Sequence, residues 1–121
     1  MLINLSNHPK KLWCAKQTES AISAFCSIID IAFPSIPPDA DSKYITDLAE
    51  EYAEKILIII SNSEDKANAV HIMGEMNLCF SLITLLKSKN IICLASTSKR
   101  STLTMESKKI SEFNFVSFRE Y

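Results

Sequence analysis

The stretch Ala69–Phe80 constrains the fold of this chain most strongly. An apolar run, Ala69–Met73, ends at Gly74, the only glycine among 121 residues, and a helix-like pattern begins directly after it. Because the run does not alternate between apolar and polar residues, it is typical of a parallel strand covered on both faces. The stretch therefore predicts a central strand, a tight turn and a helix, and in α/β proteins such a turn faces the ligand crevice.

The same order of strand and helix occurs on both sides of this stretch. The expected strands share a short apolar run bounded by turn-forming or polar residues, and they are Met1–Leu5, Ile28–Ala32, Ala69–Met73 and Ile91–Ala95. The expected helices share apolar residues at spacings of three and four, and they are Cys14–Phe25, Ile45–Ile59 and Met76–Leu86. This alternation predicts an α/β fold with right-handed crossovers and helices on both faces of a mostly parallel sheet.

The C-terminal part of the chain has a different character. Ser96–Thr102 is rich in hydroxyl groups and basic residues, and Leu103–Met105 and Ile110–Phe118 are short β-prone runs around the polar Glu106–Lys109. These runs predict a terminal antiparallel β-hairpin. We therefore expect residues 1–121 to form a single Rossmann-like, flavodoxin-like three-layer domain, βαβαβαβ followed by the hairpin, with strand order 2-1-3-4.

The composition argues against several classes of protein. A net charge of −1 gives no general attraction to duplex nucleic acid or to an anionic membrane. No apolar run reaches the roughly 20 residues of a membrane span, and Met1–Leu5 is too short for a signal peptide, so we expect a cytoplasmic protein. The four cysteines stand far apart within apolar patterns, which predicts reduced core thiols and no zinc site. No metal or cofactor is expected.

The fold predicts where a ligand would bind. In a parallel sheet the ligand lies beyond the carboxyl ends of the strands. Four polar segments are expected to meet at that rim, and they are Ser6–His8, Phe33–Ser35, Gly74–Met76 and Ser96–Arg100. The nucleotide-binding patterns Gly-x-Gly-x-x-Gly and the Walker lysine motif are both missing, so ordinary dinucleotide and P-loop sites are not predicted.

Ser96–Arg100 is the strongest candidate for an anion contact. It places three hydroxyl groups, Lys99 and Arg100 after one predicted strand, and phosphate is bound by such donors. A solvated basic loop is the alternative interpretation. Gly74 permits a close backbone approach or a positive φ, and the alternative there is a plain tight turn.

Five other residues have chemistry worth testing. His8, in the first rim loop, is suited to moving a proton near neutral pH, or it is a surface histidine. His71 lies in the middle of a strand, where a hydrogen-bonded core residue is the favoured interpretation. Glu75 opens a helix and either caps it or binds ligand hydroxyls. Trp13, one helical turn from Gln17, either stacks on a base or packs in the core.

Several of these strings resemble a known family. Asn4–Pro9 with Trp13 and Gln17, the turn Val70–Met76 and the turn Ala95–Arg100 resemble small CRISPR-associated proteins with a minimal CARF-like Rossmann domain. The resemblance covers about the first hundred residues. It implies a homodimer that binds cyclic oligoadenylate across its two-fold axis, as in type III CRISPR signalling.

The resemblance also implies a reaction and a set of site residues. Some CARF-type proteins, the ring nucleases, cleave the ring without metal, because the ribose 2′-hydroxyl attacks the adjacent phosphate. By position, the implied catalytic residues are His8, as a proton carrier, and Lys99. The implied ligand contacts are Ser6, Asn7, Gly74, Glu75, Ser96, Thr97, Ser98 and Arg100. The chain shows no effector domain, which favours a stand-alone ring-binding or ring-degrading protein.

Two other functions stay open. The predicted helix Met76–Leu86 is apolar almost all round, so a partner subunit is expected as its second cover, and it could equally serve a non-catalytic interaction protein. A small-molecule enzyme with the same crevice is a third possibility. Ser96 and Ser98 have no histidine near them in sequence, so no nucleophile is evident.

Overall fold

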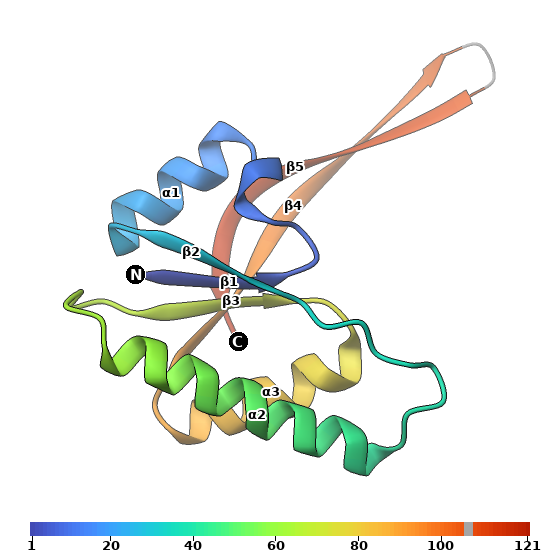
Figure 1. Ribbon diagram of the computed structural model, residues 1–121. Coiled ribbons are helices and arrows are strands. Elements are labelled where there is room, and N and C mark those ends of the chain that lie inside the picture. Colours follow the sequence, from blue (N-terminus) through green and yellow to red (C-terminus); the bar gives the residue numbers. More distant parts are fainter. Residues whose placement is uncertain (106–107) are drawn as a thin grey trace.

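The computed structural model describes residues 1–105 and 108–121, and the side chains from 103 to 111 are outside that description. Figure 1 shows strands and helices alternating up to a long C-terminal hairpin. The strands are β1 (Leu2–Ser6), β2 (Ile28–Ala32), β3 (Ala69–Met73), β4 (Ile92–Met105) and β5 (Lys108–Glu120). The helices are the 3₁₀ helix η1 (Lys10–Leu12), α1 (Ala15–Phe25), α2 (Ser42–Ser61) and α3 (Met76–Ser88). The predicted helices and the first three strands are confirmed to within a few residues.

The five strands form one mixed sheet in the order β2-β1-β3-β4-β5. The pairs β1–β2, β1–β3 and β3–β4 are parallel, and β4–β5 is antiparallel. The chain thus has an α/β fold with a mostly parallel sheet, and the first four strands follow the predicted order. The carboxyl ends of β1, β2 and β3 lie at one edge, as parallel strands require.

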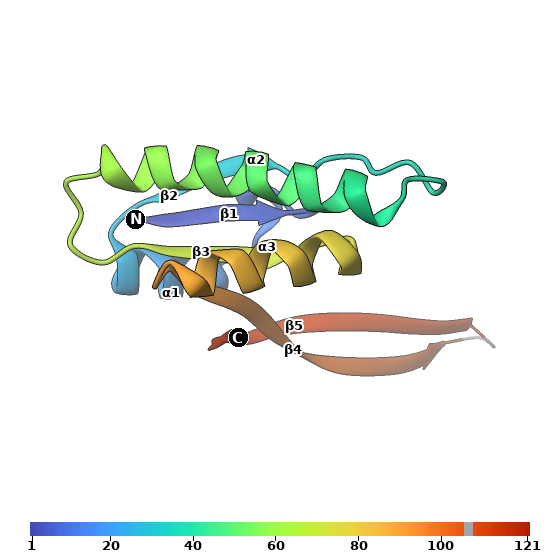
Figure 2. The ribbon, with the colours of Figure 1, turned by 90° about the horizontal axis from the view of Figure 1, so that it is seen from below.

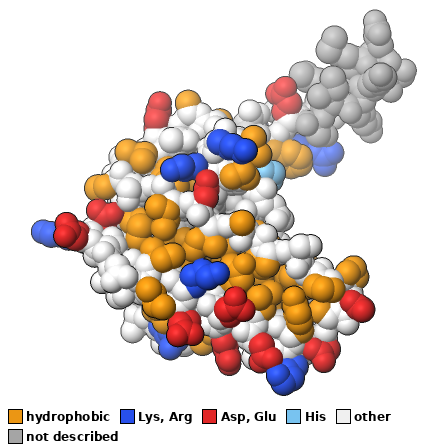
Figure 3. Space-filling view, in the orientation of Figure 1, with side chains coloured by type: hydrophobic (Ala, Val, Ile, Leu, Met, Phe, Trp, Pro, Cys, Tyr) orange, Lys and Arg blue, Asp and Glu red, His pale blue; other side chains and the backbone are white. Residues whose placement is uncertain are grey.

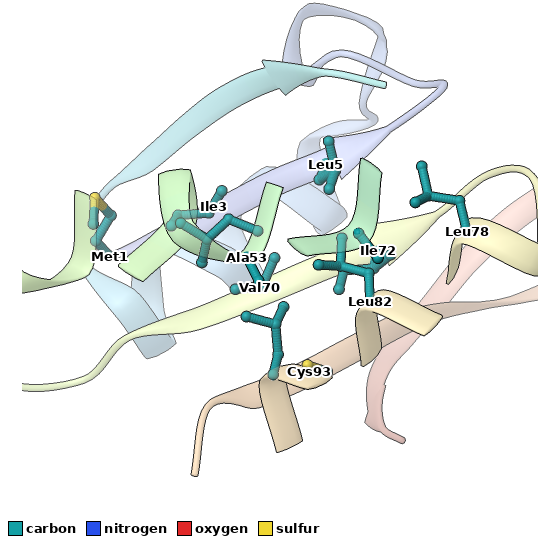
Figure 4. Close-up of a cluster of buried hydrophobic side chains, with 12 residues drawn as sticks. Met1, Ile3, Leu5, Ala53, Val70, Ile72, Leu78, Leu82 and Cys93 are labelled. Atoms are coloured by element: carbon teal, nitrogen blue, oxygen red, sulfur yellow. The ribbon is translucent and has the colours of Figure 1, made fainter. Parts of the chain in front are cut away.

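Each face of the sheet has its own hydrophobic cluster. On one face, side chains of β1 and β3 pack against α2 and α3, and Figure 4 shows Ile3, Val70 and Ile72 meeting Ala53 and Leu82. On the other face, a smaller cluster joins the sheet to α1; its fully buried members are Leu2, Ala21 and Ala69. Figure 2, turned by 90°, shows α2 and α3 beside the parallel strands and the outer part of the hairpin extending beyond them.

The hairpin differs from the prediction in its length. β4 does not end at Ala95 but continues without a break to Met105, so Ser96–Arg100 is part of a strand and not a turn at a strand end. The physical reason is a partner. β5 pairs with β4 from Leu94–Glu120 to Met105–Lys108, with one register shift between Thr97 and Ser98, and this satisfies backbone groups that a loop would leave to water. The predicted polar segment Glu106–Lys109 includes residues 106 and 107, which lie outside the described residues.

Helix α3 buries only one of its apolar faces within this chain. Leu78, Leu82 and Leu86 are buried, whereas Met76 is 81% exposed and Phe80 is 74% exposed. Figure 3 shows how much hydrophobic surface is visible on one side of the molecule. The predicted second cover for this helix is therefore not supplied by the chain itself.

Two of the four cysteines depart from the prediction. Cys93 is buried and Cys79 is half-buried, but Cys14 and Cys26 are exposed, and all four are free thiols. Cys14 and Cys26 lie at the two caps of α1, outside its buried face. Among the described residues no helix is long and apolar enough to cross a membrane.

Candidate functional site

Three polar residues form a row across the centre of the sheet. Asp30, Asn4 and His71 are each the middle residue of their strands, and the strand register places Asn4 beside both of the others. Asn4 is 1% exposed and His71 is 2% exposed, so two polar side chains are buried in a region otherwise filled by apolar groups. Buried polar groups are costly unless they are paired, so the row must hold its own hydrogen bonds.

The hydrogen bonds of Asn4 fix its orientation. Its amide nitrogen donates to Asp30 Oδ1 at 2.8 Å and to the carbonyl oxygen of His8 at 2.9 Å. Its Oδ1 accepts from Ser6 Oγ at 2.8 Å and lies 2.8 Å from His71 Nδ1. Because both amide hydrogens are used on acceptors, the oxygen must face the imidazole, and Nδ1 is therefore the donor.

This arrangement sets the chemical state of His71. With its proton on Nδ1, the neutral ring carries a lone pair on Nε2. That atom has no hydrogen-bond partner, and within the described residues it is one of two buried side-chain polar atoms in that state. Burial, with a smaller contribution from the nearby charge of His8, lowers the pKa of His71 to about 4. At neutral pH, Nε2 is a buried, unprotonated acceptor.

The same hydrogen bonds hold the loop after β1. The carbonyl oxygen of His8 accepts from Asn4 Nδ2 and from Trp13 Nε1 at 3.0 Å, and it lies 3.0 Å from Ser6 Oγ. The backbone N–H of Lys10 donates to both carboxylate oxygens of Asp30, at 3.1 and 3.2 Å. The short helix η1 and Trp13 are thereby anchored over the polar row, so the loop is positioned before any ligand arrives.

A pocket of about 440 Å³ lies between this loop, the start of α1 and the base of the hairpin. His71 lies at its floor, where the rings of Trp13 and Phe118 both pack edge-on against it, with centroids 5.5 and 5.6 Å from the imidazole. The other lining residues combine aromatic, sulfur and hydroxyl groups: Ser6, His8, Leu12, Cys14, Gln17, Met73, Ser96, Thr97, Ser98, Phe113 and Phe115. We call this the His71 pocket.

Strand β4 contributes one wall of the His71 pocket. Ser96 donates from its backbone N–H and from its hydroxyl to Met73 Sδ, at 3.3 and 3.0 Å, and Thr97 bonds to the backbone and hydroxyl of Ser117. Side chains alternate along a strand, so Ser96, Ser98 and Arg100 share one face. The guanidinium of Arg100 lies 5.9 Å from the ring centre of Phe113, its cross-strand neighbour.

The structure brings together only part of the predicted site. Ser6, His8, Ser96, Thr97 and Ser98 all line the His71 pocket, as do Trp13 and Gln17. Lys99 is exposed and, by strand alternation, points to the opposite face of the hairpin, so the structure does not bring it beside His8. Asn7 lines a separate hollow of about 310 Å³ with Asp30 and Phe33.

Gly74 and Glu75 lie outside the His71 pocket. Glu75 caps α3, because its carboxylate accepts from the backbone N–H groups of Asn77 and Leu78 at 3.0 and 2.8 Å, and these bonds lower its pKa. Gly74 does not have a positive φ. A Cβ at this position would lie 2.4 Å from the ring of Phe33, so the close approach of that ring explains the glycine.

Sequence reasoning missed Asn4 and Asp30, and it assigned His71 only to the core. The signal was present, since three predicted strands each carry one polar residue at or near the centre of an apolar run. With the predicted strand order, β1 lies between the other two strands, so the three residues become neighbours. The register, which periodicity does not reveal, was needed to see that they meet.

Comparison with known proteins gives one relationship. No curated protein and no solved structure matches the chain. The sequence profile described as "Uncharacterized protein MJ1673 family" matches residues 1–119, which is nearly the whole chain. The chain therefore belongs to the MJ1673 family.

Proposed function

We propose that this protein is a homodimeric, CARF-like domain of Rossmann-like, flavodoxin-like architecture that binds a cyclic oligoadenylate-type nucleotide. The observation that carries the proposal is the His71 pocket, which lies where β1, β3 and β4 leave the body of the sheet. Ligands of open α/β sheets bind at this edge. The resemblance of the rim segments to CARF-like proteins supplies the ligand class, and such a signalling nucleotide would place the protein in the cytoplasm.

The chemistry of the pocket fits one nucleotide unit. Its volume of about 440 Å³ lies within the range of small-molecule sites, roughly 300–1,000 Å³. Phe113, Phe115 and Trp13 offer aromatic surfaces on which a base can stack. The hydroxyls of Ser96 and Ser98 offer donors to ribose or phosphate oxygens.

A ring of several nucleotides needs more than one such pocket, and a two-fold dimer would provide a second. A groove of about 530 Å³ along α3 supports this assembly; it is lined by Met73, Gly74, Met76, Cys79, Phe80, Ile83, Thr84, Lys87 and Tyr121. We call it the α3 groove. Met73 lines both the α3 groove and the His71 pocket. A second copy docked on α3 would therefore adjoin the nucleotide site.

Ring cleavage is the activity to test after binding. In that reaction the ribose 2′-oxygen forms a bond to the adjacent phosphorus and its proton passes to a base. The bond from phosphorus to the 5′-oxygen breaks, and the departing 5′-oxygen takes up a proton to become a hydroxyl group. His8 is exposed and lines the pocket, so it is our candidate to carry the 2′-hydroxyl proton. Ser96 and Ser98 are the candidates to position the phosphate.

Incubation with cyclic tetra-adenylate tests the proposal. Calorimetry measures binding, chromatography detects linear products, and size-exclusion with light scattering gives the oligomeric state. We expect saturable binding by a dimer. If binding is seen, His8→Ala is expected to slow any cleavage more than it weakens binding, because a proton carrier acts in the transition state. A protein that binds no cyclic tetra-adenylate would contradict the proposal.

A protein-interaction module is the second candidate function. The exposure of Met76 and Phe80 on α3 favours it, since large apolar surfaces mark interaction sites. The two functions can be distinguished by comparing the activity of matched variants in cells. Under the interaction function, Phe80→Glu abolishes activity and His8→Ala has no effect, whereas a nucleotide-binding function depends on His8.

A further inference from the structure

The imidazole of His71 has an unused bonding capacity. Nδ1 is committed to Asn4, while Nε2 is buried and has no partner. The ring lies in the floor of the His71 pocket, between Trp13 and Phe118. An unsatisfied buried acceptor is destabilising, so its presence at the bottom of a pocket calls for a bonding partner.

The neighbouring groups leave one nitrogen of the imidazole as an acceptor without a partner, whichever way the ring is turned. Asn4 accepts from Nδ1 and is itself fixed by its bonds to Asp30 and to the His8 carbonyl. A flipped ring can donate to Asn4 Oδ1 only as the neutral Nε2–H tautomer, which leaves Nδ1 as the unpaired acceptor. In the orientation of the structure that acceptor is Nε2, and it faces away from β1.

We propose that Nε2 of His71 accepts a hydrogen bond from a donor group of the bound nucleotide, either a ribose 2′-hydroxyl or the amino group of adenine. This inference rests on the proposed function, and it adds which kind of group on the ligand the pocket recognises, namely a hydrogen-bond donor. Sites that offer a buried acceptor reject analogues lacking the matching donor, because the acceptor is then left unpaired. His71 is thus a specificity-determining residue, and Asn4 is the residue that positions it.

Ligand analogues test this inference on the wild-type protein. The probes are cyclic tetra-adenylate, its 2′-deoxy analogue, and its inosine analogue, in which the adenine amino group is replaced by a carbonyl. We expect one analogue to bind roughly 5- to 150-fold more weakly than cyclic tetra-adenylate, and the other to bind with little change. The weaker analogue identifies which donor reaches Nε2.

The variant His71→Phe provides the second half of the comparison. Phenylalanine keeps a ring in the pocket floor but has no acceptor, so the difference between the three ligands is expected to disappear. Comparing ligand ratios within each protein removes any general loss of affinity. Should His71→Phe fail to fold, the ¹⁵N resonance of Nε2 in the wild type decides, because it must move when cyclic tetra-adenylate binds.

The outcomes separate the two proposals. Binding of cyclic tetra-adenylate with equal affinity for all three ligands overturns the role of His71 and leaves the proposed function standing. The same conclusion follows if His71→Phe keeps the wild-type discrimination, or if the Nε2 resonance does not move on binding. If the wild type binds none of the three rings, both the proposed function and this inference are overturned.

Discussion

The His71 pocket and the α3 groove meet at Met73, yet they differ in their polar groups. The pocket has the buried imidazole of His71 at its floor and hydroxyl groups on one wall. The groove is lined mainly by apolar side chains, among them the exposed Phe80 and Met76. A polar floor discriminates between ligands that differ by one donor, whereas an apolar groove suits a protein surface. Under the proposed function, the two adjacent hollows would therefore take different partners.

Among the predicted effects, the largest is the loss of stability on replacing Asn4, which holds His71 at the floor of the pocket. Asn4→Leu removes the acceptor for His71 Nδ1 and Ser6 Oγ, two buried groups, and it also removes the donor to Asp30. We expect the free energy of unfolding to fall by about 4 kcal/mol. Urea denaturation measures this. Asn7→Leu, at an exposed position in the same loop, is the control and should change stability by less than about 0.5 kcal/mol. Equal effects of the two variants would contradict a structural role for the row.

Lowering the pH tests the buried state of His71 at the floor of the pocket. The pKa of His71 is about 4 in the fold, below its ordinary value of 6.5, so the unfolded chain takes up the proton first as the pH falls. Its contribution to stability is complete above pH 6.5 and is lost between pH 6.5 and 4, by about 3 kcal/mol. The measurement is unfolding at several pH values in wild type and His71→Phe. The difference between the two proteins should shrink across this window; a constant difference would show that His71 does not titrate as described.

A substitution at Gly74, which lines the α3 groove, tests the close approach of Phe33 to the backbone there. Gly74→Ala places a Cβ within 2.4 Å of the present position of the Phe33 ring, which must move. We expect a loss of about 1–2 kcal/mol in thermal or urea unfolding, because overpacking forces neighbours from their positions. The double variant Gly74→Ala with Phe33→Leu should recover part of this loss. Additive effects of the two substitutions would rule out their direct contact as the cause.

The groove itself is expected to tolerate substitution. Phe80→Glu changes a side chain that is 74% exposed, so the monomer should lose less than about 0.5 kcal/mol. The dimer, by contrast, would have to bury a charge and should dissociate, as light scattering can show. Thr84→Glu, on the same helix and lining the same groove, is a graded comparison, and Glu50→Gln on α2 is a distant control. A dimer that survives Phe80→Glu would place the interface elsewhere.

The sequence was sufficient to predict most of the architecture. Periodicity found α1, α2 and α3, and apolar runs found β1, β2 and β3, because each element buries a face with its own repeat. Periodicity failed at Ser96–Arg100, whose polar residues resemble a loop and become strand only because β5 pairs with them. It also failed for the site, since Asn4, Asp30 and His71 meet through strand register, a property of three strands together.

Trp13 provides the most direct measurement of where the ligand binds. It is the only tryptophan in the chain, and its ring lines the His71 pocket and contacts His71. Titration with cyclic tetra-adenylate, followed by the intrinsic fluorescence of Trp13, should show a saturable change with the same affinity as calorimetry. Binding seen by calorimetry with no change in Trp13 fluorescence would contradict the assignment of the nucleotide to this pocket.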